Sequence, residues 1–169
     1  MRNKLFMVIF IITFGLLVGC SEEASLDPVS IDENVDSCDV CSMGILDVDA
    51  ATQVIMEDGD PKMYDDIGCM ITDLQQNKDM AIGKIYVHDY NSNDWIEFDN
   101  ATFIQDEATP TPMSYGIIAF ESQEEAESFQ KENGGDIYTK DQIIEIDIQA
   151  LKQEDGHDEH HDHMSEDDE

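Results

Sequence analysis

The sequence has few basic residues: 8 Lys and Arg stand against 40 Asp and Glu, which gives a formal net charge of −32 at pH 7. A surface this acidic repels nucleic-acid phosphates and anionic lipid headgroups, so neither is expected to be a binding partner. The sequence also lacks a hydrolase constellation, a phosphate-binding glycine loop and a dinucleotide fingerprint. We therefore predict no enzymatic reaction. Solubility alone would account for the acidity equally well.

The N-terminus carries a short apolar run behind two basic residues. Arg2 and Lys4 precede apolar residues 5–18, about 14 residues, which is too short to span ~30 Å of hydrocarbon comfortably. Gly19 stands directly before Cys20, and Leu17 occupies the position that a lipoprotein peptidase prefers. Residues 1–19 are therefore predicted to be a lipoprotein signal peptide, with Cys20 lipidated and the protein anchored on the extracytoplasmic face of the cell membrane. An ordinary secretory signal that happens to end in Cys is the alternative.

Composition divides the rest of the chain into three parts. Residues 20–37 are acidic and poor in large apolar side chains, which predicts a flexible tether after the lipidated cysteine. Residues 38–152 hold nearly all the aromatic side chains and suit a single domain. Residues 153–169 are rich in His and acids and cannot bury a core, so a disordered tail is predicted.

Within the domain, strand and helix patterns alternate. Residues 52–56 and 62–64 predict a hairpin, because the intervening Asp58-Gly59 suits a tight turn. Residues 66–76 place apolar side chains on one helical face, and residues 84–90 predict the next strand.

The second half repeats this order. Strands are expected at 101–104 and 115–120, followed by a helix that Ser122 opens as a capping box with Glu125 and that Gly134-Gly135 ends. A last strand is expected to start at Ile137, whereas residues 141–151 fit a helix or a strand equally well. The predicted fold class is α+β, with two ββαβ units in which a small antiparallel or mixed sheet carries a helix.

The cysteines point to metal chemistry. If Cys20 is lipidated, three thiols remain, so a complete set of disulfides is impossible. Cys38-x-x-Cys41 followed by Met43 forms a compact set of soft donors, and soft donors select Cu(I). Zinc normally needs four N or S ligands in a closed site, and the chain has one such pair. These residues therefore predict a Cu(I) site.

Two other functions fit the same residues. A thiol-disulfide oxidoreductase would use Cys38 and Cys41 as a redox pair, but Gly44 disfavours the helix that usually follows such a pair. A structural or solute-binding lipoprotein would use the sulfur atoms only to stabilise its fold.

Several other residues are additional candidate ligands. Met113 follows Pro112 in a loop before an apolar strand and is expected to supplement the site. Cys69 falls outside the apolar stripe of its helix, so we expect it to be exposed and a candidate ligand, and His88 fits either a ligand or a structural histidine. Imidazoles suit borderline metals such as Cu(II), and the tail carries four of them: His157, His160, His161 and His163. The tail is predicted either to act as a metal reservoir or to have no function.

Several motifs together resemble the NosL family, the accessory copper-binding lipoproteins of nitrous oxide reductase. They are the Leu17–Cys20 lipobox, Cys38–Met43, Val87–Tyr90 leading to Trp95-Ile96 and Ala101, and Thr111–Gly116 leading to Ala119-Phe120. The resemblance runs from Cys38 to about Ile144. One departure is Ser42, where the family usually has Gly.

The resemblance implies two ββαβ units and a chaperone that hands Cu(I) to the reductase during its maturation for denitrification. The expected partners are nitrous oxide reductase and a copper-related membrane transporter. It implies no catalytic reaction. The tail from Gly156 onward lies outside the resemblance.

Overall fold

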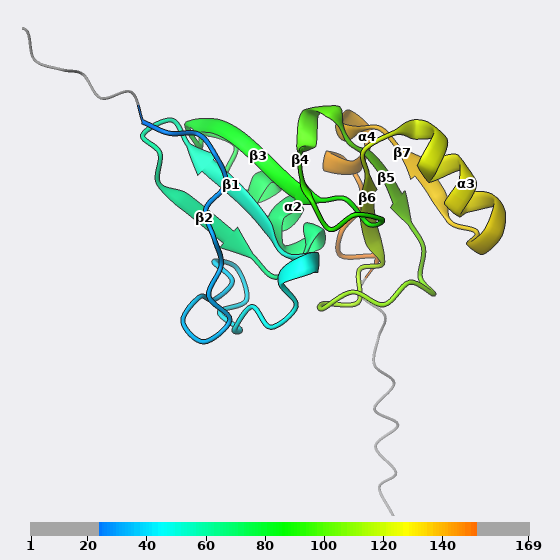
Figure 1. Ribbon diagram of the computed structural model, residues 1–169, viewed down its shortest axis with the longest axis horizontal. Helices are drawn as coiled ribbons and strands as arrows, with labels where there is room; N and C mark the ends of the chain where they lie inside the picture. The colour runs from blue at the N-terminus through cyan, green and yellow to red at the C-terminus, as the bar shows by residue number, and fades with distance from the viewer. Residues whose placement is uncertain (1–23, 152–169) are drawn as a thin grey trace, which may run out of the picture.

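Two antiparallel sheets form the framework of the computed structural model, which describes residues 24–151. The first sheet has the order β2-β1-β3-β4 and the second β6-β5-β7 (Figure 1). The first unit contains β1 (Thr52–Met56), β2 (Pro61–Tyr64), α2 (Ile67–Gln76), β3 (Ile82–His88) and β4 (Trp95–Glu97). The second contains β5 (Thr102–Gln105), β6 (Ile117–Phe120), α3 (Gln123–Asn133), β7 (Asp136–Tyr138) and α4 (Lys140–Ile144). The α+β fold with two ββαβ units is therefore confirmed.

The first unit follows the predicted hairpin closely. Thr52 pairs with Tyr64, and Gly59 at the turn has a φ of +89°, which favours glycine. β3 begins at Ile82, two residues before the predicted strand, and ends at His88. The sequence analysis missed β4, which pairs with β3 and is only three residues long, too short for an alternating pattern to show.

Helix α2 lies against this sheet and begins one residue after its cap. The Asp66 carboxylate accepts a hydrogen bond from the Cys69 backbone N–H at 2.8 Å, so Asp66 is the N-cap and Ile67 the first helical residue. Met70 and Ile71 are fully buried beneath the helix. Within residues 24–151, no helix combines the length and apolar character that crossing a membrane requires.

The second unit also matches its predicted order. The Ser122 hydroxyl accepts from the Glu125 N–H and donates to the Glu125 carboxylate, so Ser122 caps α3 as predicted. Gly134 ends α3 at a φ of +101°. In the ambiguous segment, a short helix, α4, occupies residues 140–144 and turns follow it.

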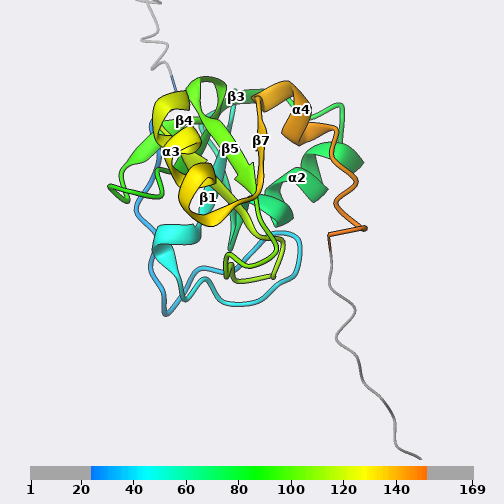
Figure 2. The same cartoon turned by 90° about the vertical axis from the view of Figure 1, so that its right-hand side faces the viewer.

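The two units share a core. A parallel bridge pairs Asp89 with Ala119, and the Asp89 carboxylate accepts the Glu121 N–H at 2.8 Å. Burial would raise the pKa of Asp89, but N–H donors, Glu121 first among them, hold it below its usual value. One apolar cluster runs through both units and includes Val54, Met70, Phe98, Phe103 and Ile117. Figure 2 shows α2 and α3 on separate sides of this arrangement.

The segment before the domain differs from the expected flexible tether where the structure describes it. Val29 exchanges two hydrogen bonds with the buried Gln53 side chain, at 2.9 and 2.7 Å, and Ser37 pairs with Gly44. The part of the segment around Val29 thus lies against the first sheet, and Ser37 joins the loop that follows (Figure 1). Composition could not reveal this contact, because it depends on a single buried side-chain amide, Gln53 in β1, that bonds the backbone of Val29. The predicted signal peptide, Cys20 and the His-rich tail lie outside the described residues.

Candidate metal centre

A tight loop, Cys38–Met43, carries the first two cysteines. The Cys38 N–H donates to the Met43 carbonyl at 2.8 Å, and the Ser42 N–H donates to the Cys38 carbonyl at 2.9 Å. Asp39 fixes the loop to β2 through reciprocal bonds with Met63, at 2.8 and 2.7 Å. Ser42 has a φ of +61°, in the left-handed region that favours glycine, so the position is one where Gly is the less strained residue.

Three cysteines and one carboxylate converge beneath this loop. One donor atom from each of Cys38, Cys41, Asp65 and Cys69 lies within 4.8 Å of all the others. The loop supplies two of these residues, the β2–α2 connection supplies Asp65, and the first turn of α2 supplies Cys69. All three described cysteines are free thiols. The arrangement is a four-donor pocket, referred to below as the metal centre.

Cys69 corrects the sequence analysis on one point. We expected it to be exposed, but only 1% of it is accessible. The apolar stripe marks the face of α2 that packs on the core. The Cys38–Met43 loop then covers the other side of the first turn, which a helical wheel of α2 alone does not show.

Asp65 is the residue that the sequence analysis missed. Its Oδ2 accepts from the Cys41 thiol at 3.4 Å, while its buried Oδ1 has no hydrogen-bond partner among the described residues. An unpaired buried carboxylate oxygen is unfavourable, and a cation in the metal centre would satisfy it. The sequence signal was the Asp65-Asp66 pair three residues before Cys69, which we considered only for its effect on the thiol.

Hydrogen bonding between thiols sets the charge of the metal centre. The Cys69 thiol lowers the pKa of Cys38 to about 6, although burial opposes this. The same bond, together with burial, raises the pKa of Cys69. Burial raises the pKa of Cys41 to about 11, and the neighbouring negative charge of Cys38 adds to the effect. The bond between Cys38 and Cys69 therefore favours the thiolate at Cys38 and the protonated thiol at Cys69.

The role of the two predicted methionines as ligands stays a prediction. Met43 closes the loop and is about half exposed. Met113 lies between β5 and β6, packs against the core cluster that contains Cys38, and donates its N–H to Asp66 at 3.0 Å.

His88 lies apart from the four donors. Its Nδ1 is 3.0 Å from the Ala51 carbonyl oxygen, and its ring stacks on Trp95 with centroids 3.6 Å apart. Burial lowers the pKa of His88 and so favours the neutral ring. These contacts match the structural interpretation of His88.

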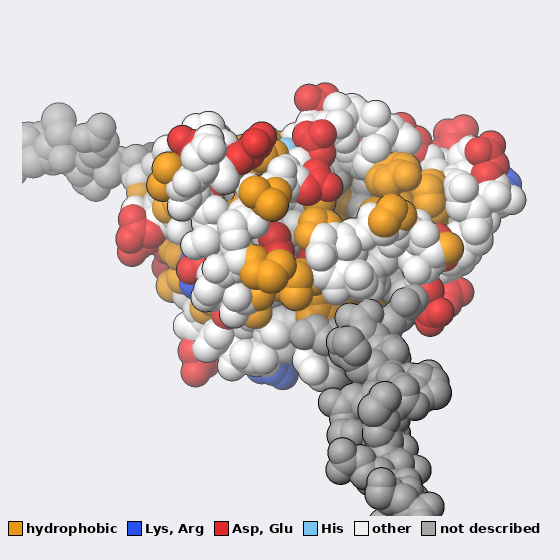
Figure 3. Space-filling model, turned by 90° about the horizontal axis from the view of Figure 1, so that it is seen from below, with side chains coloured by type: hydrophobic (Ala, Val, Ile, Leu, Met, Phe, Trp, Pro, Cys, Tyr) orange, Lys and Arg blue, Asp and Glu red, His pale blue; other side chains and the backbone are white. Residues whose placement is uncertain are grey.

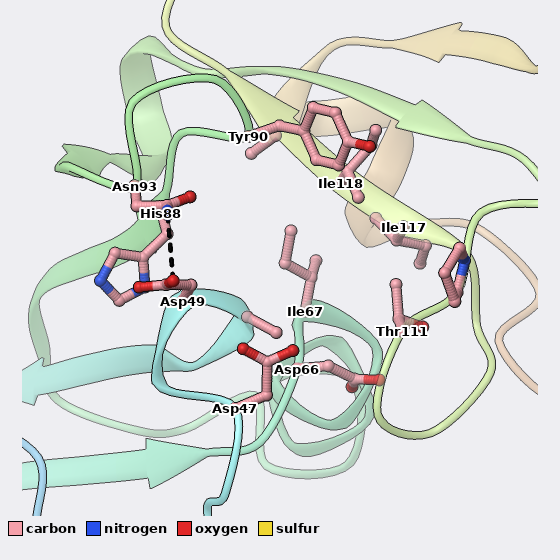
Figure 4. Close-up of a pocket in the computed structure, with 13 residues that line it drawn as sticks. Asp47, Asp49, Asp66, Ile67, His88, Tyr90, Asn93, Thr111, Ile117 and Ile118 are labelled. Atoms are coloured by element: carbon pink, nitrogen blue, oxygen red, sulfur yellow. Dashed lines mark hydrogen bonds between the residues drawn. The ribbon is translucent and has the colours of Figure 1, made fainter. Parts of the chain in front are cut away.

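A cavity of about 160 Å³ opens between the two units and is lined by residues of both (Figure 4). Asp47 and Asp49 line one side, and Asn93 donates to the Asp49 carboxylate at 3.0 Å. Ile67 and Ile117 line the apolar part, and Asp66, the cap of α2, also borders the cavity.

The family follows from a sequence comparison. The NosL family model matches residues 28–147. The chain belongs to the NosL family. A solved structure, the copper chaperone NosL from Shewanella denitrificans, superposes with a TM-score of 0.59 at 21% identity, covering 69% of this chain and 95% of that one. This likeness supports the NosL fold, and no curated protein matches the chain.

The donors of this NosL-family protein suit a soft metal ion with a low coordination number. Three sulfur atoms can hold a monovalent copper ion in two- or three-coordination, and the carboxylate adds negative charge and a weak oxygen donor. The backbone N–H of Cys69, in the first turn of α2, donates to the Asp66 carboxylate beside this centre.

Asp66 is predicted to make the stability of the NosL domain depend on pH. Burial raises its pKa to about 6, although the Cys69 and Met113 N–H groups oppose the shift. The folded state therefore binds this proton more tightly than the unfolded state. The resulting stabilisation is complete below the ordinary pKa of 3.8 and is lost as the pH rises through about 6.

We expect Asp66→Asn to remove this effect, because Asn keeps the helix cap without the charge. Between pH 4 and 7, the unfolding free energy of the parent should fall relative to that of the variant by up to roughly 3 kcal/mol. Urea unfolding at both pH values measures the difference. If the unfolding free energies of parent and variant differed by the same amount at pH 4 and pH 7, Asp66 would not be the source of the pH dependence.

Proposed function

We propose that this protein is a Cu(I) chaperone, anchored by lipid at Cys20 to the outer face of the cell membrane, that delivers copper for maturation of nitrous oxide reductase. The observation that carries the proposal is the convergence of three cysteines and a buried carboxylate within 4.8 Å in a NosL-family domain. The name of the Shewanella denitrificans protein, a copper chaperone, supports the same cargo. The protein catalyses no reaction of its own.

The thiol chemistry supports uptake and release of Cu(I). Cys38 is poised as a thiolate and can bind the ion first, and Cys41 and Cys69 each lose a proton to join it. Cys41 is the least buried of the three cysteines and gives an incoming thiol or imidazole of an acceptor its point of attack. Such stepwise ligand exchange suits an ion that tolerates two to four ligands.

Anaerobic titration of the reduced, lipid-free protein with Cu(I) against a calibrated chelator tests the cargo. The parent should compete for one tight equivalent, and Cys38→Ser/Cys41→Ser should lose it. Met43→Leu in the same titration should weaken binding without unfolding the domain. Met80→Leu is the matched control, because Met80 lies beyond the far end of α2. No competition by the parent would refute the chaperone, and an unchanged affinity in Met43→Leu would remove Met43 from the site.

Anchoring and delivery need the full chain in cells. Cys20→Ser should move the protein from the membrane fraction to the soluble extracytoplasmic fraction. Deleting the gene should leave nitrous oxide reductase copper-deficient at limiting copper, and a plasmid copy with intact Cys38 and Cys41 should restore it. Fully loaded reductase in the deletion strain would exclude the delivery role.

A further inference from the structure

Exposed apolar side chains gather around the metal centre. Six large apolar side chains are exposed within residues 24–151, and four of them belong to one short segment. These four are Val35, Val40, Met43 and Leu46. Figure 3 shows the molecule from below, where apolar side chains cluster with acidic ones among and around them. Such a cluster on a soluble domain commonly marks an interaction site.

An ordered ribbon holds these side chains in place. Ser37 pairs with Gly44, and the Ile45 N–H donates to the Asp36 carbonyl at 3.1 Å. Continuing the same register sets Val35 opposite Leu46, and these two are 76% and 79% exposed. Ile45, which precedes Leu46 and lies opposite Asp36, is fully buried and fixes the ribbon to the domain. The apolar pair is therefore displayed by a supported element.

Acidic residues surround this apolar centre. Residues 31–50 contain six Asp and Glu and no Lys or Arg. The exposed ones are Asp32, Glu33, Asp39, Asp47 and Asp49. An anionic membrane, a second copy of this chain and its own acidic residues 153–169 would all be repelled by this rim. Charge complementarity therefore favours a protein with a basic surface.

The cavity beside the rim offers a specific contact. Asp47 and Asp49 stand on one side of it and Ile67, Ile117 and Ile118 on another (Figure 4). A Lys or Arg side chain would fit this arrangement, with its alkyl part against the isoleucines and its charge at the carboxylates.

We propose that Val35, Val40, Met43 and Leu46, together with the rim residues Asp47 and Asp49, form the docking surface for the protein that exchanges copper with the metal centre. That partner carries an apolar patch ringed by Lys and Arg. The inference rests on the proposed function and adds where and by what chemistry the partner binds. Docking here covers the half-buried Cys41, so ligand exchange proceeds away from water.

The apolar half of the docking surface is tested by direct binding in the absence of copper. Copper-free nitrous oxide reductase is the probe, and its affinity for the parent is compared with that for Val35→Ser/Leu46→Ser. We expect binding about tenfold weaker, as for loss of one interface anchor. The Cu(I) affinity and the urea midpoint should not change. Val29→Ser is the matched control, since Val29 is exposed on the part of the segment that borders β1.

The acidic half is tested by association rates. Asp47→Asn/Asp49→Asn should slow association with the same probe and flatten its dependence on salt. Glu124→Gln/Glu132→Gln removes the same charge from exposed positions of α3, at the end of the molecule away from the Cys38–Met43 loop, and should leave both unchanged (Figure 1).

The outcomes separate this inference from the proposed function. Equal binding by the parent and Val35→Ser/Leu46→Ser, or no binding by either, overturns the docking surface. A parent dimer, or binding to phosphatidylglycerol vesicles, that Val35→Ser/Leu46→Ser abolishes would assign the surface to another occupant and also overturn it. Failure of the proposed function is read separately, as a parent Cu(I) affinity no higher than that of Cys38→Ser/Cys41→Ser.

Discussion

Replacing Cys69 with serine is expected to weaken Cu(I) binding by more than about 100-fold, the upper range for losing a residue that only orients a ligand. The Cys69 sulfur is one of the four donors that meet within 4.8 Å, and the hydroxyl of serine is a hard donor that Cu(I) disfavours. Because Ser is close to Cys in size and the Asp66 cap bonds the backbone of residue 69, α2 should stay folded. Competition with a Cu(I) chelator measures the loss.

The comparison with Cys38→Ser/Cys41→Ser sharpens this test. If Cys69 is a ligand, Cys69→Ser should leave a two-sulfur site of intermediate affinity, between the parent and the double variant. Parent-like affinity in Cys69→Ser would restrict the site to the loop cysteines. Circular dichroism and urea unfolding provide the control for folding, and Met80→Leu again serves as the remote variant.

Most of the fold was predictable because its elements carry local signals. The hairpin was readable from Asp58-Gly59 and the second helix from Ser122, since turn and cap chemistry depends on residues close in sequence. β4 was not, because three residues cannot establish a period. The contact of Val29 with Gln53 joins positions 24 residues apart, and composition carries no trace of it.

Only the part of the metal centre that lies within one short loop was predictable from the sequence. Only two residues separate Cys38 from Cys41, so their convergence is a local property of one loop. Asp65 and Cys69 join them only because Asp39 bonds to Met63 and so lays the loop against the end of β2. Helical periodicity defined the face of α2 that packs on the core, but it could not show that a second segment covers the opposite face.

Adding a single methyl group at Gly68 should have a large effect on stability. In an exposed helix, Gly→Ala stabilises by about 1 kcal/mol. Here the added Cβ would overlap the ring of Tyr115, which is buried between α2 and β6. We expect Gly68→Ala to destabilise the domain by roughly 3 kcal/mol, because a packed ring cannot move away without opening the core.

The same variant links packing to copper binding, since Gly68 precedes Cys69 in the first turn of α2. Displacing that turn should move one sulfur out of the cluster and lower the Cu(I) affinity as well as the unfolding free energy. Gly44→Ala is the matched control in the metal loop, because nothing lies within 4 Å of its added Cβ. It should change the unfolding free energy by no more than about 0.5 kcal/mol.

A second-site variant decides whether the Tyr115 ring is the cause. Tyr115→Leu shortens the side chain that Gly68 contacts, so adding Gly68→Ala in that background should cost much less than it does in the parent. Urea unfolding of the parent, the two single variants and the double variant gives the coupling free energy, which we expect to exceed about 1 kcal/mol. Additive effects would show that the two residues do not interact, and α2 would then be held against the second unit by other contacts.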